Sequence, residues 1–152
     1  VKPRTVQDHE NFQHKNGKPF SSYLLHETGS DLVVKDYDVA KMIVPYFMRR
    51  PYMVMLVFRD ASKGFLHELS EGEIEAAAEG WFDATRAFHS LMPQIGKDIA
   101  YNIIMHSGTS GGLYFEFLPY TQPMGGLEHL GLYVCQETPH RAADWLRSFL
   151  VS

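Results

Sequence analysis

The sequence has little cysteine. Cys135 is the only one in 152 residues, so an intrachain disulfide is excluded. A long hydrophobic run is also lacking, because no segment approaches the roughly 20 apolar residues that a membrane helix needs. The first ten residues, VKPRTVQDHE, have no apolar centre of the kind found in a signal peptide. We therefore expect no membrane association, a reducing compartment and a cytoplasmic location.

Clustered positive charge is scarce as well. The formal net charge is -4, and no Lys/Arg cluster is larger than Arg49-Arg50. Proteins that bind nucleic acid usually present a basic face to the phosphate backbone. Nucleic acid is therefore not an expected partner.

Internal repeats and low-complexity linkers are missing from the sequence. A chain of about 150 residues buries roughly 70% of its extended surface, which is enough for a core of its own. The sequence therefore predicts one domain that spans residues 1–152.

Capping patterns predict two main helices. Ser70 and Glu73 form a capping box, in which the hydroxyl and the carboxylate each accept the backbone amide at the other's position. Apolar residues at three- and four-residue spacing continue this helix to about Met92, and Pro93 ends it. Thr138, followed by a proline, begins the last helix. A short helix is also expected at residues 21–27.

Six segments rich in β-branched and aromatic residues are predicted strands. Residues 51–58, PYMVMLVF, are apolar on both faces, which is typical of a central strand. The polar, turn-rich first twenty residues are expected to wrap the surface without regular structure. The order of elements predicts an α+β fold with a mainly antiparallel sheet and two main helices packed on it. The other predicted strands are residues 30–36, 39–47, 100–106, 113–119 and 130–136.

Three segments, in this order, resemble the hexose-1-phosphate uridylyltransferases. VKDYDVAKMIVPYFMRRPYMVMLVFRDASKGFLHELSEGE resembles their aromatic Val-Pro-Tyr strand, the Arg/Trp-Pro-Phe-Glu turn, an apolar strand and the Phe-Glu-Glu-Leu-Ser helix start. YNIIMHSGTSGGLYFEFLPY is similar to their Tyr-Asn-x-x-x-His-x-Ala-Pro and His-x-His-x-Glu-Phe-x-Pro strands. GGLEHLGLYVCQETPHRAADWLRSF resembles their Ala-Gly-Phe-Glu-x-Gly-x-x-x-Asn segment and Pro-Glu-x-Ala-Ala-x-x-Leu-Arg helix.

The resemblance covers roughly residues 15–149 and points to the C-terminal half of the galactose-1-phosphate uridylyltransferase family. Each half of these two-domain enzymes has the histidine-triad fold, so the resemblance implies a histidine-triad-like domain. It also implies nucleotidyltransferase chemistry on sugar nucleotides in galactose metabolism. Because the C-terminal half supplies hexose contacts across the subunit interface, it further implies a homodimer or a partner chain that carries the N-terminal catalytic half.

The sequence departs from the family at the catalytic histidines. The nucleophile of the family lies in a His-Pro-His motif of the N-terminal half, and this sequence has no His-x-His at all. If Glu116 is the matched acid, Gly112 and Tyr114 replace the His-x-His pair that precedes it. The covalent step of the family is therefore not expected here.

The metal ligands of the family are replaced too. Metal-binding members have Cys-x-x-Cys and a histidine at positions that Pro19, Ser22 and Asp60 occupy here. Zinc and iron sites need three or four imidazole, thiolate or carboxylate donors at fixed spacing. No metal and no cofactor are expected.

His106, the family's retained strand histidine, is the candidate catalytic residue. Two interpretations stay open for it: a nucleophile or base, and a half-buried histidine bonded to a backbone carbonyl. The loop SGTSGG that follows is either a phosphate cradle or a plain hairpin turn. Its candidate binding residues are Ser107, Thr109, Ser110, Gly111 and Gly112.

Three other polar residues complete the expected substrate site. They are Glu116, Gln122 and Glu128, and Glu128 matches the family position that approaches the hexose. A solvated surface position is the alternative for Glu128. Arg49 and Arg50 have two interpretations. They could bind a phosphate or the carboxylates of another chain, or they could belong to a solvated turn.

The remaining titratable candidates are expected to be structural. His9, His14 and His26 fit no known ligand spacing, so surface positions are predicted for them. Cys135 is interpreted as a small residue of the core.

Three functions are consistent with these residues. The first is a degenerate uridylyltransferase-like domain that binds a sugar phosphate or nucleotide, or completes a partner's site. The second is an active nucleotidyltransferase or hydrolase that uses His106. The third is a pure dimerisation or interaction domain.

Overall fold

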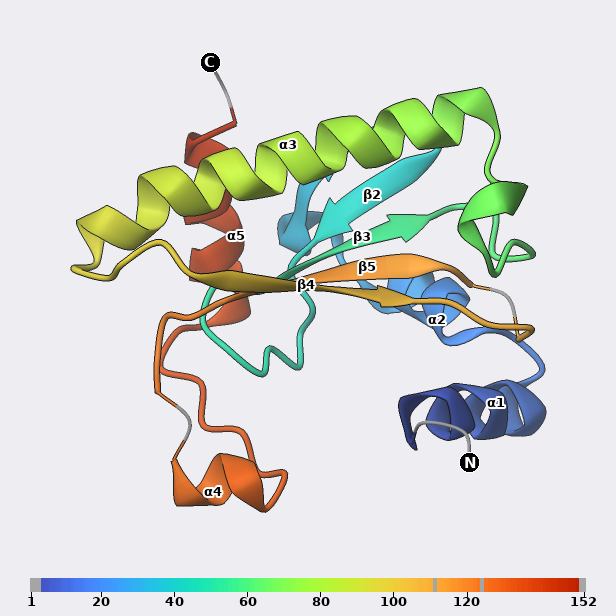
Figure 1. The fold of residues 1–152 in the computed structure, drawn as a ribbon, viewed down its shortest axis with the longest axis horizontal. Helices are drawn as coiled ribbons and strands as arrows, with labels where there is room; N and C mark the ends of the chain where they lie inside the picture. The colour runs from blue at the N-terminus through green and yellow to red at the C-terminus, as the bar shows by residue number, and fades with distance from the viewer. Residues whose placement is uncertain (1–3, 111, 124, 151–152) are drawn as a thin grey trace.

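The computed structural model describes residues 4–110, 112–123 and 125–150, and centres on a five-stranded sheet (Figure 1). The strand order is β1-β2-β3-β5-β4, and every neighbouring pair is antiparallel. β3 lies at the centre, as the uniformly apolar segment 51–58 predicts. The strands are β1 (Val33–Asp36), β2 (Ala40–Ile43), β3 (Val54–Phe58), β4 (Tyr101–His106) and β5 (Tyr114–Pro119).

Helices cover both faces of the sheet and confirm the α+β fold class. In Figure 1 the long α3 runs above the sheet, α1 and α2 lie below it, and α4 projects away from the body. α5 packs beside β1. The described helices are α1 (Arg4–Asn16), α2 (Phe20–Glu27), α3 (Glu71–Gln94), α4 (Gly126–His129) and α5 (Pro139–Ser148), with short 3-10 turns η1 (Ser30–Leu32) and η2 (Leu66–Glu68).

The predicted helix starts are confirmed. Ser70 Oγ accepts the amide of Glu73 at 3.4 Å, and the Glu73 carboxylate accepts the amide of Ser70 at 2.8 Å. The Thr138 hydroxyl caps α5 by accepting the amide of Arg141 at 3.4 Å. Pro93 lies inside α3 instead of ending it. A proline in the last turn of a helix is tolerated, because it removes one backbone hydrogen bond and no further helical turn follows.

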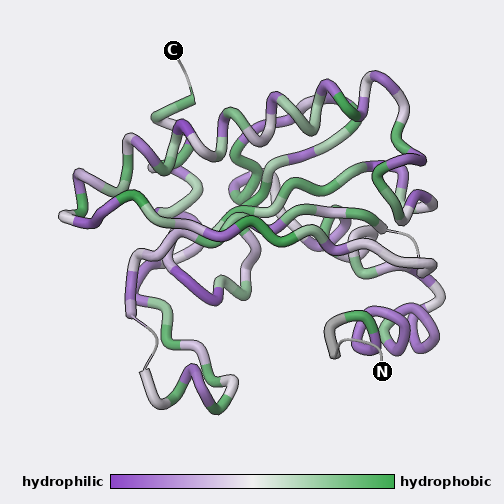
Figure 2. The backbone as a smooth tube through the Cα atoms, viewed as in Figure 1, coloured by the Kyte–Doolittle hydropathy of each residue, from purple (hydrophilic) through white to green (hydrophobic). Residues whose placement is uncertain are grey.

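The first twenty residues are more regular than the sequence predicts, because α1 forms there. Phe12 of α1 packs edge-on against Phe20 and Tyr23 of α2, at ring centroid distances of 5.3 and 5.7 Å. Most of α1 is coloured as hydrophilic in Figure 2. A helix with so few apolar residues has the composition of a polar surface segment, so the sequence did not indicate it.

The predicted strand at residues 130–136 is wrong. The segment follows α4 and has no regular structure, and Leu130 and Leu132 are 78% and 60% exposed. A strand is stable only when a neighbouring strand pairs with its backbone groups, and no described strand does so here. The segment therefore forms no strand, although its composition is typical of one.

The hydrophobic core fills both sides of the central strands. All residues of β3 and β5 are buried, and Figure 2 shows the hydrophobic residues concentrated in the sheet. Gly80 lets α3 approach β3 closely, since a Cβ there would lie 2.7 Å from a methyl group of Leu56. In the part of the chain that the structure describes, no helix is long and apolar enough to cross a membrane.

Replacing Ser70 by Ala removes the α3 cap. We expect the free energy of unfolding to fall by about 1 kcal/mol, measured by urea denaturation. Ser90→Ala on the same helix is the control, because no hydrogen bond among the described residues involves the Ser90 hydroxyl. It should change stability by less than about 0.5 kcal/mol. Equal losses in the two variants would contradict the capping role of Ser70.

Candidate functional site

β4 and β5 place three polar side chains on one face of the sheet. His106 is directly opposite Tyr114 in the strand register, and Ile104 is opposite Glu116. Because side chains alternate between the faces of a sheet, His106, Tyr114 and Glu116 point to the same side. The rings of His106 and Tyr114 stack at a centroid distance of 4.4 Å. His106 Nε2 lies 3.0 Å from Glu116 Oε2, so its partner is this carboxylate and not a backbone carbonyl.

Two more side chains join this group from other elements. Arg49, in the β2–β3 connection, donates to Glu116 Oε1 and forms an ion pair with it. His9 of α1 has Nε2 3.0 Å from the Tyr114 hydroxyl, and its ring meets the His106 ring edge-on at 5.3 Å. Both oxygens of Glu116 are therefore engaged, and α1 is tied to the β4–β5 hairpin.

Glu116 stays ionised although its side chain is only 3% exposed. Burial by itself raises the pKa of a carboxyl group, but the hydrogen bond with His106 and the charge of Arg49 outweigh it. The pKa of Glu116 therefore lies below its ordinary value. For His9, burial and then the charge of His106 lower the pKa, against the opposing carboxylates of Asp8 and Glu116. At neutral pH the site pairs a negative Glu116 with a neutral His9.

An open cleft of about 240 Å³ borders these side chains, and a second cavity beside it has about 10 Å³, which is room for one water. The cleft is large enough for one ring of a ligand, not for a whole sugar nucleotide. Its lining residues are Asp8, His9, Phe20, Phe47, Arg49, Met55, His106, Tyr114 and Glu116. The small cavity is lined by Val6, His9, Phe20, His106, Ser107, Ser110, Gly112 and Tyr114.

The glycine-rich loop after His106 is held by the connection between β3 and α3. Three amides at the two ends of the loop donate to carbonyls of that connection, so they are not available to a phosphate. These bonds run from Gly108 to Gly64 (3.0 Å), from Gly112 to Ala61 (2.8 Å) and from Leu113 to Lys63 (2.9 Å).

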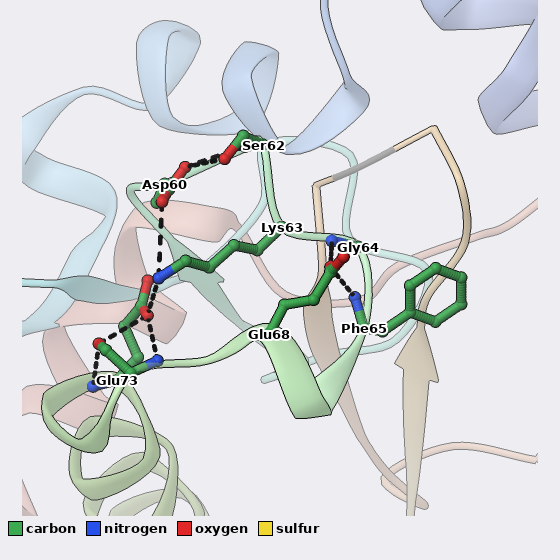
Figure 3. A network of polar contacts seen from close by, with 8 residues as sticks. Asp60, Ser62, Lys63, Gly64, Phe65, Glu68 and Glu73 are labelled. Atoms are coloured by element: carbon green, nitrogen blue, oxygen red, sulfur yellow. Dashed lines mark hydrogen bonds and ion pairs between the residues drawn. The ribbon is translucent and has the colours of Figure 1, made fainter.

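The connection itself is fixed by a polar network (Figure 3). The Lys63 ammonium pairs with Glu73 and lies 3.5 Å from Asp60. Glu68 Oε2 accepts the amides of Gly64 at 2.6 Å and Phe65 at 2.9 Å. Because Glu73 also caps α3, the start of that helix and the loop beside His106 are held by one set of hydrogen bonds.

Gly112 has a steric role in this loop. Its φ is 72°, and a Cβ would lie 2.4 Å from Ser21 Oγ and 2.7 Å from Pro19 Cβ. Any other residue would be strained and would collide with the start of α2. This glycine therefore lets the loop lie against α2.

Several of the sequence-predicted binding residues gather at His106. Ser107, Ser110 and Gly112 line the small cavity, and Glu116 holds the His106 ring. Thr109 and Ser110 border a shallower hollow against α1. Gly111 lies outside the described residues.

Gln122 and Glu128 do not reach this cleft. Both residues follow β5. Antiparallel pairing places the last residue of β5 beside the first residue of β4, whereas His106 is the last residue of β4 and lies at the other end of these strands. The Gln122 amide donates to the Val134 carbonyl at 2.7 Å, and the Glu128 carboxylate accepts the Gly125 amide at 2.9 Å. Within one copy of the chain these two residues have structural partners.

In the described ranges, no group of three or more His, Cys, Asp and Glu side chains is arranged to hold a metal ion. Pro19 and Gly112 stand where the resemblance places family ligands, and they lie against each other. Asp60 accepts hydrogen bonds from the amide and hydroxyl of Ser62, at 3.1 and 2.6 Å. The titratable side chains that line the cleft are His9, His106, Asp8, Glu116, Arg49 and Tyr114.

Sequence reasoning missed His9, Arg49 and Tyr114 as members of one group. Strand alternation was a usable signal for Tyr114, which is two residues from Glu116 and on the same face. His9 contacts a residue 105 positions away, and we had expected it at the surface. No local pattern reports such a contact.

No protein-family model and no curated protein matches the chain, but solved structures do. A uridylyltransferase superposes with a TM-score of 0.82 at 19% identity, over 99% of this chain and 52% of that chain. An ADP-glucose phosphorylase from Arabidopsis thaliana, with bound ADP-glucose, has a TM-score of 0.73 at 17% identity, over 97% and 50%. A zinc-bound histidine triad family protein from Mycobacterium smegmatis has a TM-score of 0.58 at 11% identity, over 86% and 91%.

The chain has a uridylyltransferase-like fold. The resemblance found in its motifs is thereby confirmed at the level of the fold, and the smaller histidine triad protein shares it. The chain spans about half the length of the uridylyltransferase and the ADP-glucose phosphorylase. At these sequence identities the superpositions show a shared fold, and the activity of this chain is a matter for proposal.

Replacing Arg49 by Met removes the charge that stabilises the buried Glu116. We expect the free energy of unfolding at pH 7 to fall by about 2 kcal/mol, below the range for a fully buried pair because the Arg49 side chain is 34% exposed. Since the folded pKa of Glu116 is depressed, its contribution is complete above the ordinary value of 4.5 and is lost as pH falls through the folded value. Denaturant titrations from about pH 7 to about pH 3 should show the deficit shrinking.

Arg50→Met is the matched control for this prediction. Arg50 lies over the Tyr120 ring at 4.8 Å and pairs with no carboxylate among the described residues. Its loss of stability should be the same at both ends of the pH range. A deficit in Arg49→Met that is equally independent of pH would contradict the role of the Arg49–Glu116 pair.

Proposed function

We propose that this chain is a degenerate hexose-1-phosphate uridylyltransferase-like domain that binds a sugar phosphate or nucleotide without the family's covalent step. The observation that carries the proposal is the state of His106. Its Nε2 is held by Glu116, its face is covered by Tyr114, and its side chain is 11% exposed. The imidazole is part of a packed network that borders the cleft.

Three features of the cleft support binding. Phe20 and the half-exposed Phe47 offer aromatic faces to a base or sugar ring. The hydroxyls of Ser107 and Ser110 adjoin the small cavity beside it. One solved neighbour with this fold contains bound ADP-glucose, which supports a nucleotide sugar as the ligand class.

Covalent transfer makes demands that these residues do not meet. A nucleotidyl intermediate needs an imidazole nitrogen aimed at the phosphorus and a cation or donors that stabilise the phosphoryl oxygens. Arg49, the Arg or Lys residue among the described lining of the cleft, is paired with Glu116. The amides at both ends of the glycine-rich loop are bonded to the β3–α3 connection.

An active nucleotidyltransferase or hydrolase is the second candidate, and one observation favours it. Glu116 orients His106 through Nε2, as the carboxylate of a catalytic triad orients its histidine. In that case His106 Nδ1 is the nucleophile or base. Retention of a labelled nucleotidyl group on the protein separates this candidate from pure binding.

A dimerisation or interaction domain is the third candidate, favoured by an apolar groove of about 480 Å³. The groove lies between α3 and β4, an edge strand with one unpaired side. We propose that a homodimer, or a partner chain with the N-terminal catalytic half, covers it, and that residues 1–152 act as one domain. The groove residues are Leu66, Ile74, Ala77, Ala78, Trp81, Ile103, Met105 and Phe115.

Incubation with uridine diphosphate glucose labelled in the phosphate next to uridine should leave no label on the protein. Calorimetry should show reversible binding that His106→Asn weakens about tenfold, the effect of one lost hydrogen bond to a charged ligand. His26→Asn is the control, since the His26 side chain is 83% exposed. Retained label that disappears in His106→Ala would replace the proposal by the second candidate.

Met105→Lys tests the groove. We expect the unmodified chain to be a dimer by light scattering at tens of micromolar, and the variant to be a monomer because a buried ammonium lacks a partner. Ile104→Lys, on the opposite face of β4, is the control for a change of charge alone. A monomeric unmodified chain at every concentration would rule out the homodimer.

A further inference from the structure

The charged side chains that line the cleft of the proposed function do not favour a negatively charged ligand. Among its described lining residues, Asp8 and Glu116 are carboxylates and Arg49 carries the guanidinium. Counting these carboxylates and the guanidinium alone, the lining has one more negative than positive charge, and Arg49 is already paired with Glu116. A phosphate or pyrophosphate that enters this cleft meets repulsion unless further positive charge appears there.

Two imidazoles line the cleft and can supply that charge. The rings of His9 and His106 are 5.3 Å apart. In the described structure each ring uses only Nε2, His9 toward the Tyr114 hydroxyl and His106 toward Glu116. Nδ1 of each ring is therefore the nitrogen left to donate to a ligand oxygen.

We propose that His9 of α1 and His106 of β4 form the anion-binding pair of this cleft, and that a phosphate-containing ligand binds together with a proton taken up by the pair. The inference rests on the proposed function and adds to it the residues, their charge state and the class of ligand. α1, which the sequence led us to expect as an irregular surface segment, thereby becomes part of the binding site.

The proton balance follows from the groups that face the two rings. Asp8 lies on α1, Arg49 comes from the β2–β3 connection, and Tyr114 and Glu116 come from β5. In the empty cleft, burial and then the charge of His106 keep the pKa of His9 below its ordinary value of 6.5. A bound anion raises that pKa, because it stabilises the imidazolium.

Protonated His9 has two N–H donors. Nε2–H then donates to the Tyr114 oxygen, and Nδ1–H donates to the ligand. The added proton comes from solvent, and no covalent bond of the ligand is formed or broken. Because the bound form holds more protons than the free form, affinity falls as pH rises above the pKa of the empty site.

The test is calorimetry of the whole chain with uridine diphosphate glucose, between about pH 5.5 and about pH 8, in buffers of different ionisation enthalpy. The pyrophosphate diester keeps its charge over this range, so any proton taken up belongs to the protein. We expect uptake that approaches one proton near neutral pH, and affinity that falls about tenfold per pH unit above it.

Two substitutions of His9 assign the proton. His9→Gln keeps a polar partner for Tyr114, and His9→Phe keeps the stack on Phe20, where the ring centroids are 5.6 Å apart. Both should remove most of the proton uptake and flatten the pH dependence, while thermal unfolding checks that α1 stays docked. His26→Gln, on α2, should change neither quantity.

The outcomes separate the two proposals. Binding with proton uptake that both His9 variants lose supports the imidazole pair. Binding without proton uptake overturns the pair and leaves the proposed function standing. Proton uptake that survives in both His9 variants overturns the role of His9. No binding at any pH overturns the proposed function and this inference with it.

Discussion

One buried carboxylate organises the site. Glu116 lies in a strand that is covered on both faces, and an ionised group there is costly unless both of its oxygens are paired. One partner comes from the neighbouring strand and the other from the β2–β3 connection. The position of His106 and the course of the chain around Arg49 therefore follow from the same electrostatic requirement.

Tyr114 contacts both histidines of the cleft. Its ring stacks on His106, and its hydroxyl lies 3.0 Å from His9 Nε2. Burial, and the nearby Glu116 charge, also raise the pKa of Tyr114, so the hydroxyl stays neutral. Tyr114 thus ties α1 to the cleft through His9 and covers the His106 ring.

The sequence predicted those parts of the fold that local chemistry determines. The capping box at Ser70 and the apolar run of β3 depend on neighbours in sequence or on uniform burial, so both appeared as predicted. α1 was missed because its docking rests on a few aromatic contacts. The strand predicted at residues 130–136 was wrong because the segment has a β-type composition but no described neighbouring strand pairs with it. In the site, His106 and Glu116 were recognised singly, whereas their pairing depends on the register of the β4–β5 hairpin.

The loop beside His106 is held in place by hydrogen bonds to the β3–α3 connection. Lys63 and Glu73 join the start of α3 to the connection that carries the loop, and the amides of Gly108 and Gly112 are used in that attachment. A phosphate cradle needs free amides, and these two are already bonded. Positive charge for an anion must then come from side chains. Since the one guanidinium of the described lining is paired with Glu116, the imidazoles of His9 and His106 are the side chains that we propose for this role.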